Sequence, residues 1–465
     1  MAITITKQPL ARTTVSTLLP IFFECSETTA NTTNLVAKCF WVDQTTATET
    51  QIGGSYRLAP NLENADIFYF DASEIFNTLT KYTLNDMPNI IMGEDVGTYS
   101  DNIQSWADVA TFEVLVKFYR EYIDSVTGLI VLDTTPEDSN TFTVHEGCPD
   151  QKWLTSVVKS NGINESTFKY FQFDYVPTYR QKRWMTNYPM VHKTGDIQHY
   201  VEIGLNESYI VNFLPTDQSY CGYKLSIKTY DSSDTLLNTH EETVAESTNL
   251  HTALVGFRDI RNGLTASVAE GTDFEDVAYY TVKFLTGTNI TAPCVYANIS
   301  TVYKFTVRRK CNGEGYLRFA FKNMLGGWDM WSSRGEYVKK AKMKFSKFEK
   351  SLGYEDWTNS MLFGHNNWAT EQVEEISVTT QPMRDEYAQH AVEMMSSTDT
   401  YIRVTNDWFD KVDAPPLDAL QDNYPYFFQP IQIKSSSVEV FKTSKNVTKI
   451  KFSFVKSVDQ RLPRN

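Results

Sequence analysis

The sequence offers few residue combinations that could perform metal chemistry. His192 and His199, with Asp196 between them, form the only local histidine cluster in the sequence. A metal site needs ligands that converge at short, fixed spacings, and this pair does not provide them. His145-Glu146 matches the first half of an HExxH zinc motif, but Pro149 stands where the second histidine is required. The sequence therefore predicts no metal site and places His192 and His199 at the surface or in turns.

Signatures of covalent catalysis and nucleotide binding are also missing. The chain has no GxSxG nucleophile elbow and no P-loop, and Gly313-Glu314-Gly315 lacks the third glycine of a dinucleotide turn. Its cysteines are widely spaced and form no CxxC pair: Cys25, Cys39, Cys148, Cys221, Cys294 and Cys311. We expect no cofactor, and we expect Cys25 and Cys39 to be buried, reduced thiols in strands.

Carboxylates leave one enzymatic alternative open. The 57 Asp and Glu residues could include a glycosidase pair, and several tryptophans could stack on sugar rings: Trp328, Trp331, Trp357 and Trp368. No two carboxylates can be nominated from sequence, and aromatic residues most often pack in cores or interfaces. We predict that the chain is not an enzyme, with polysaccharide degradation as the alternative.

The segment from Gly315 to Trp331 carries the most specific local pattern. A β-type run ends at an Asn-Met-Leu-Gly-Gly corner, which we expect to be built by Asn323, Gly326, Gly327, Trp328 and Asp329. Two adjacent glycines allow positive φ at low cost. Asp329 is predicted to accept backbone N–H groups or to pair with Arg318 or Arg334, which would hold the turn. The basic segment before Trp184, with Arg180, Lys182 and Arg183, suggests a second packed junction.

Composition indicates a mainly β protein whose partner is not nucleic acid. Aromatic residues make up 14% of the 465 residues, many of them beside β-branched neighbours. The net charge of −14 argues against binding of a phosphate backbone. The lysines from Lys339 to Lys344 are predicted to line a solvated strand, with contact to an acidic partner as the alternative. Neither a secretory signal nor an apolar run of the roughly 18 residues of a membrane helix is expected.

The elements that would position these residues divide into three regions. Residues 1–195 are predicted to form an N-terminal β-sandwich-like region with a polar insert near 85–106, and residues 196–350 a second β-sandwich-like domain that carries the corner. Residues 351–465 are predicted to form a C-terminal segment with one helix after Pro382 and a few strands. A short helix after Asp71 is expected to be capped by that residue.

Three segments together resemble a known family. Arg183-Trp184-Met185-Thr186-Asn187-Tyr188-Pro189, Tyr316-Leu317-Arg318-Phe319 and Asn323-Met324-Leu325-Gly326-Gly327-Trp328-Asp329 are similar to segments of virion proteins of tailed phages that infect Bacteroidetes, the crAss-like phages. The order of the β-regions across most of the chain also resembles that family.

The resemblance implies a structural subunit of the virion tail or its collar, made in the host cytoplasm. Its implied partners are copies of itself in a closed ring and other tail or portal-proximal proteins, around a conduit through which DNA passes without specific binding. Neither membrane nor cofactor is implied. A carbohydrate-binding or receptor-binding virion protein is the first alternative, and it would need an exposed aromatic platform.

Overall fold

The described part of the chain is mainly β, with many more residues in strands than in helices, which confirms the predicted class. The computed structural model describes residues 3–9, 14–29, 31–81, 103–105, 110–147, 186, 191–193, 196–205, 209–214, 223–244, 250–257, 259–261, 274–287, 296–298, 300–308, 316–349, 365–404, 427–434 and 448–456. These form two compact units. The first comprises residues 1–310 and 323–329, and the second comprises residues 311–322 and 330–465.

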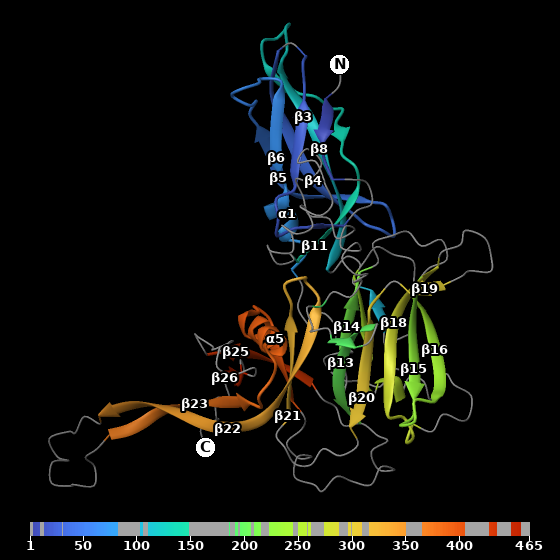
Figure 1. Cartoon of the computed structure of the whole chain (residues 1–465). Helices are drawn as coiled ribbons and strands as arrows, with labels where there is room; N and C mark the ends of the chain where they lie inside the picture. The colour runs from blue at the N-terminus through green and yellow to red at the C-terminus, as the bar shows by residue number, and fades with distance from the viewer. Residues whose placement is uncertain are drawn as a thin grey trace, which may run out of the picture. The chain divides into compact units, whose positions relative to one another are not determined.

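The first unit begins with a β-sandwich (Figure 1). One sheet has the order β1-β3-β6, and its strands are Thr4–Lys7, Phe22–Ser26 and Ile67–Asp71. The main path of the other is β2-β11-β8-β4-β5, with strands Thr14–Ser16, Phe142–His145, Thr111–Ile123, Thr32–Val42 and Glu49–Leu58. Two short strands, β9 (Ile130–Leu132) and β10 (Glu137–Asp138), also pair with β8.

Alternation along these strands produces the core, because every second side chain of a strand points to the same face. Phe23 from one sheet contacts Phe118 and Phe142 from the other, at centroid distances of 5.7 and 6.1 Å. Cys25 and Cys39 are buried in the same core as free thiols, as predicted.

The helix expected after Asp71 forms, but Asp71 is not its N-cap residue. Helix α1 spans Ser73–Asn77, and its N-cap residue is Ala72, which makes no side-chain cap bond. Asp71 Oδ1 instead accepts hydrogen bonds from Ser73 N and Ile21 N, both at 3.0 Å. The carboxylate therefore ties the start of the helix to the segment before β3.

A second sandwich follows in the first unit. The main path of its larger sheet is β12-β13-β20-β18-β15-β16, and β19 pairs with β18. The strands are Val191–Lys193, Asp196–Gly204, Val302–Arg308, Tyr279–Gly287, Tyr223–Tyr230, Leu236–Val244 and, for β19, Tyr296–Asn298. The smaller sheet has the order β14-β17-β7, with strands Ile210–Phe213, His251–Leu254 and Ile103–Ser105. Phe213 packs on Phe284 across the two sheets at 4.3 Å.

Two details of this sandwich differ from the expected antiparallel unit. Strands β13 and β20 pair in parallel, and the more than ninety residues between them provide the crossover connection that parallel strands need. Strand β7 belongs to the predicted polar insert, yet it pairs with β17.

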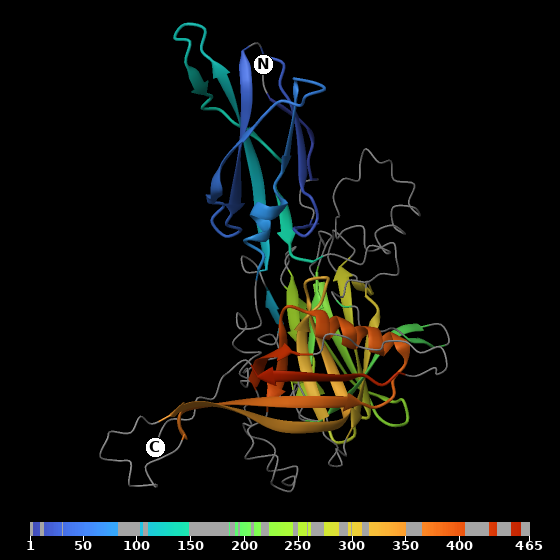
Figure 2. The ribbon, with the colours of Figure 1, turned by 90° about the vertical axis from the view of Figure 1, so that its left-hand side faces the viewer.

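The second unit is a closed barrel of order β21-β22-β23-β26-β25-β24. Its strands are Tyr316–Lys322, Trp328–Glu349, His365–Thr380, Lys451–Lys456, Phe427–Ile433 and Thr400–Val404. Helix α5, Asp385–Ser396, lies beside these strands and buries Ala388, Ala391 and Met394 in the barrel core (Figure 2). This is the helix predicted after Pro382.

The barrel takes in strands from both sides of the boundary expected at residue 350. Strands β22 and β23 flank that boundary and pair over their length, from Gly335 opposite Thr380 to Glu349 opposite His365. The lysine-rich part of β22 runs beside the acidic part of β23, and Lys342 forms an ion pair with Glu375. None of the helices that the structure describes is both long and apolar enough to cross a membrane.

Candidate functional site

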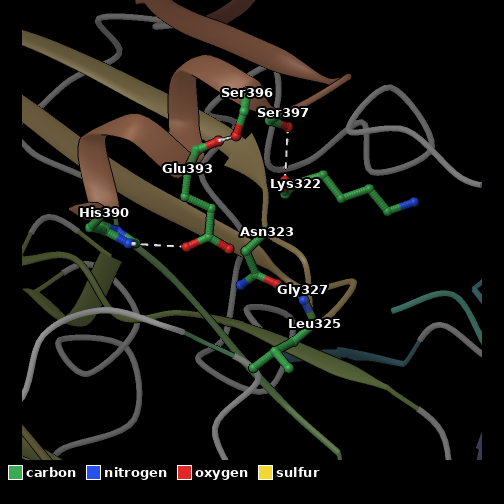
Figure 3. A network of polar contacts seen from close by, with 8 residues as sticks. All are labelled: Lys322, Asn323, Leu325, Gly327, His390, Glu393, Ser396 and Ser397. Atoms are coloured by element: carbon green, nitrogen blue, oxygen red, sulfur yellow. Dashed lines mark hydrogen bonds and ion pairs between the residues drawn. The ribbon is translucent and has the colours of Figure 1, made fainter. Parts of the chain in front are cut away.

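The corner predicted from sequence is a turn between β21 and β22 that the Asn323 side chain closes. Asn323 Oδ1 accepts hydrogen bonds from Leu325 N at 3.0 Å and Gly327 N at 3.1 Å (Figure 3). The Asn323 backbone adds two more bonds: its N–H donates to Gly327 O at 2.8 Å and its carbonyl accepts from Gly326 N at 3.0 Å. One asparagine therefore takes part in four hydrogen bonds to the backbone of the turn.

The flanking strand β21 is anchored separately. Lys322 N donates to Asp399 O at 3.0 Å, and the Lys322 carbonyl accepts from Ser397 Oγ at 2.8 Å (Figure 3). Strand β21 belongs to the second unit, whereas residues 323–329 belong to the first. The chain therefore leaves the barrel unit for seven residues and then returns to it.

Glycine is required at Gly326 for two reasons. Its φ is +82°, in the left-handed region that other residues avoid. A Cβ at this position would also overlap the carbonyl oxygen of Glu146 and lie 2.6 Å from His145 Nε2. The sequence predicted that the Gly326-Gly327 pair would allow positive φ, and the structure shows positive φ at Gly326.

The opposing segment at the end of β11 has a matching requirement. Gly147 has a φ of +152°, and a Cβ there would overlap the carbonyl of Leu325. His145 is fully buried, with its Nε2 3.1 Å from Leu325 O and its Nδ1 3.3 Å from Ala110 O. Backbone therefore packs directly on backbone where β11 meets the corner.

The other end of the corner is fixed to the second sandwich. Trp328 is fully buried, and its carbonyl accepts a hydrogen bond from Asn212 Nδ2 on β14. Asn212 Oδ1 in turn accepts from Thr252 Oγ1 on β17 at 2.7 Å. Within the first unit, the corner thus contacts strands of both sandwiches.

Asp329 is 5% exposed, which fits a role in holding the turn rather than one in contact with solvent. Arg318 is buried as well, at 2% exposed. The predicted pairing of Asp329 with Arg318 or Arg334 stays a prediction.

His199 does not lie where the sequence placed it. Instead of lying at the surface or in a turn, His199 is buried in β13, where its Nε2 is 3.0 Å from Thr301 Oγ1 and its ring stacks on Tyr303 at 4.5 Å. His251 is also buried, and it stacks on Phe213 at 5.2 Å. Across the residues that the structure describes, no three His, Cys, Asp or Glu side chains gather as a metal site would require.

Other sequence candidates separate into those that are buried and those that lie outside the described residues. Trp328 and Trp331 are in cores, at 0% and 4% exposed, so neither presents a ring to a sugar. Trp357, the side chains of Trp368 and His192, and the segment from Arg180 to Pro189 apart from Thr186 lie outside the described residues.

Sequence reasoning missed two surface features. The first is a hairpin of β8 and β9 whose tip exposes large apolar side chains: Ile123, Val126, Leu129, Ile130 and Leu132. The second is a group of lysines on the outer face of β15, β18 and β20. The run Leu129-Ile130-Val131-Leu132 had the composition of a buried strand, so its exposure could not be read from it.

Comparisons with known proteins add little. No family model matches the sequence, and no curated protein matches it. Among solved structures, a marsupial T cell receptor is similar at 5% sequence identity, over 81% of this chain and 96% of the receptor chain, with a TM-score of 0.19. A likeness at that level carries no argument about fold or function.

Proposed function

We propose that this protein is a non-enzymatic structural subunit of a phage virion tail, which assembles with copies of itself into a closed ring around the DNA conduit. The observation that supports contact between subunits is an exposed apolar surface at the end of a hairpin. We call this surface, residues 123–132, the hairpin tip. Its exposed fractions are 90% for Val126, 66% for Leu129 and 60% for Ile130. Clustered exposed apolar side chains mark sites where another surface binds.

The hairpin tip is held in one conformation without a partner. Asp124 Oδ1 accepts from Val126 N at 2.8 Å, and its Oδ2 accepts from Thr127 Oγ1 at 3.1 Å. Gly128 supplies a φ of +67° and donates to Asp124 O at 2.8 Å. A fixed turn lowers the entropy cost of docking, because little has to be ordered on contact.

Strand β9 also offers backbone groups to a partner strand. Asp124 N donates to Leu129 O and Asp133 N donates to Arg120 O, so the hydrogen-bonded pair between them is Val131 with Tyr122. Ile130 and Leu132 then direct their N–H and C=O groups away from β8. Among the described strands, β9 pairs only with β8, which leaves this edge open to strand addition.

The second unit supplies a further assembly element. Strand β26 pairs with β23 only over Glu375–Thr379, whereas β22 and β23 continue as a two-stranded ribbon to Glu349 and His365 (Figures 1 and 2). No third described strand supports that ribbon beyond the barrel. A two-stranded ribbon alone is marginally stable in water, so contact with a neighbouring subunit would stabilise it.

Two parts of this proposal, the location in a virion tail and the closed ring, rest on the resemblance to phage tail proteins. A ring subunit uses a different surface for each of its two neighbours, and the hairpin tip and the ribbon are two such separate surfaces. The net charge of −14 would keep DNA from adhering to a conduit lined by this chain. The polysaccharide-degrading alternative relied on tryptophans that could stack on sugar rings, and two of the four, Trp328 and Trp331, are buried. The adhesin alternative requires an exposed aromatic platform and is separated from this proposal by a glycan array.

The test compares Ile130→Lys with Leu62→Lys by analytical ultracentrifugation and negative-stain imaging. Leu62 is 104% exposed and lies away from the hairpin in sequence, so it controls for the added charge. We expect the wild type and Leu62→Lys to form rings as concentration rises, and Ile130→Lys to stay smaller. Equal assembly of all three proteins would remove the hairpin from the proposal. Sugar release from a host capsule that one carboxylate substitution abolishes would instead establish the enzyme.

A further inference from the structure

The outer face of the larger sheet in the second sandwich carries a group of lysines that form no ion pair with any described carboxylate. Strands β15, β18 and β20 are adjacent in that sheet (Figure 1). Ile227, Val282 and Phe305 point into the core at 1% exposed or less. Because side chains alternate, the neighbouring residues of each strand lie on the opposite face.

The register sets three lysines around one threonine on that outer face. Lys228 of β15 and Lys304 of β20 both lie directly opposite Thr281 of β18. Two strand spacings place the Cα atoms of Lys228 and Lys304 about 10 Å apart. Lys283 follows Thr281 by two residues on the same face. We name Lys228, Lys283 and Lys304 the lysine face.

Two acidic residues near the lysine face form ion pairs with other cations, and Asp234 hydrogen-bonds the Tyr279 side chain. Glu241 pairs with Lys224 at 3.1 Å, and Glu202 pairs with Arg308 at 2.6 Å. No ion pair joins Lys228, Lys283 or Lys304 to any carboxylate in the part of the chain that the structure describes. Three ammonium groups thus face outward on a chain whose net charge is −14.

Tyr230 and Tyr279 border the lysine face, and Tyr200 of β13 lies opposite Lys304. Tyr230 and Tyr279 stack at 4.8 Å with an interplanar angle of 9°. Lys304 Nζ lies 3.7 Å from the Tyr279 centroid. Tyr230 and Lys304 reach Tyr279 from the strands on either side of it, so both faces of the Tyr279 ring are occupied.

We propose that the lysine face binds a carboxylate-bearing polysaccharide. The sheet fixes the positions of the three lysine Cα atoms, and Thr281 and Thr306 stand on the same face among them. Anionic sugars need that combination, because they present carboxylates and hydroxyls together. This binding is independent of ring assembly.

Two other polyanions fit the face less well. Single-stranded nucleic acid is bound through base stacking on aromatic rings together with a basic groove, and the Tyr279 ring is already stacked on Tyr230 and contacted by Lys304. An acidic protein partner would need an apolar centre to its interface, and the core of such an interface is depleted in charge. Among the described residues of β15, β18 and β20, none is a large exposed apolar side chain.

The test is a titration with polygalacturonate at low salt, with neutral dextran and a single-stranded thymidine oligonucleotide as comparison ligands. The variant is the triple Lys228→Gln, Lys283→Gln, Lys304→Gln. Its control is the triple Lys339→Gln, Lys340→Gln, Lys451→Gln, which makes the same charge change at exposed lysines of the barrel unit. Thermal melts of both variants verify folding, and Lys283→Gln alone provides a milder version.

We expect polygalacturonate to bind the wild type and the control equally, and the lysine-face triple about tenfold more weakly. Lys283→Gln should give a smaller loss. Dextran should not bind. The proposal is overturned if polygalacturonate does not bind the wild type, if both triples lose affinity equally, or if the oligonucleotide binds as tightly as the polysaccharide.

Discussion

Gly147 and Gly326 face each other so closely that a side-chain carbon on either would overlap the backbone carbonyl of the opposing segment. The two residues are far apart in sequence, and both take positive φ, at +152° and +82°. Their contact joins the end of β11 to the Asn323–Asp329 corner. It is the reason that the corner needs glycine, beyond the turn itself.

Gly326→Ala is expected to destabilise the protein by at least about 3 kcal/mol, since the backbone must shift as well as bear strain. Gly128→Ala is the matched control, because Gly128 also has positive φ, at +67°, but nothing lies within 4 Å of its added Cβ. Strain alone should cost about 1–2 kcal/mol there. Urea unfolding measures both. Equal losses would mean that the Gly147–Gly326 contact does not matter.

Asn323→Ala removes the acceptor of two backbone N–H groups in a turn where Asn323 is 4% exposed. Buried donors left without a partner are costly, so we expect a loss of about 2 kcal/mol. Asn64 makes a similar bond to Asp66 N at 3.1 Å, but it is exposed. Asn64→Ala should therefore cost less than about 0.5 kcal/mol by the same denaturant measurement. A loss at Asn323 no larger than that at Asn64 would contradict the role given to this side chain.

His251 makes stability depend on pH. Burial lowers the pKa of His251 to about 4, from an ordinary value of 6.5. Between those two values the unfolded chain binds more protons than the folded one, so the free energy of unfolding should fall as pH drops from 6.5 to 4. The full effect is about 3 kcal/mol.

Other groups also titrate in that range, so the measurement is a difference. Unfolding free energies of the wild type and His251→Phe are compared at pH 7, 5.5 and 4, since phenylalanine retains an aromatic ring to stack on Phe213. The wild type should lose more stability on acidification than the variant. Parallel curves would show that His251 does not titrate as described.

Cys25 and Cys39 are expected to be inert in the folded protein. Burial raises the pKa of both thiols to about 12, and the carboxylates of Glu137 and Glu24 add to the effect at Cys25. The reactive thiolate is therefore scarce at neutral pH, and the sulfur atoms are shielded. Maleimide labelling followed by peptide mass mapping should leave both unmodified in buffer and modify both in urea. Rapid native labelling of either cysteine would contradict its position in the core.

Some of the fold could be predicted from sequence because it depends on local pattern. Runs such as Phe22–Ser26 and Ile67–Asp71 have β composition, and Pro382 with the spacing of Tyr387, Ala391 and Met394 marks helix α5. The asparagine and glycine residues also indicated a turn at residues 323–327. These features follow from backbone preferences and periodicity, which act over a few residues.

Other features depend on residues that the sequence does not bring together. Strand β7 completes a sheet with β17, although more than a hundred residues separate them, and β22 and β23 join a barrel across the expected boundary at residue 350. The histidines could not be placed from sequence either, because burial of His199 depends on Thr301 and Tyr303 in another strand.

The sequence by itself determined that the chain is mainly β, that residues 323–329 turn sharply, and that no familiar catalytic motif is present, because each of these rests on local composition or spacing. Only the tertiary structure decided which residues contact the turn and which side chains remain exposed at the surface. Gly326 meets Gly147, Trp328 is buried, Ile130 is exposed, and three lysines gather around Thr281. Packing and strand register set those relationships, and both are properties of the whole chain.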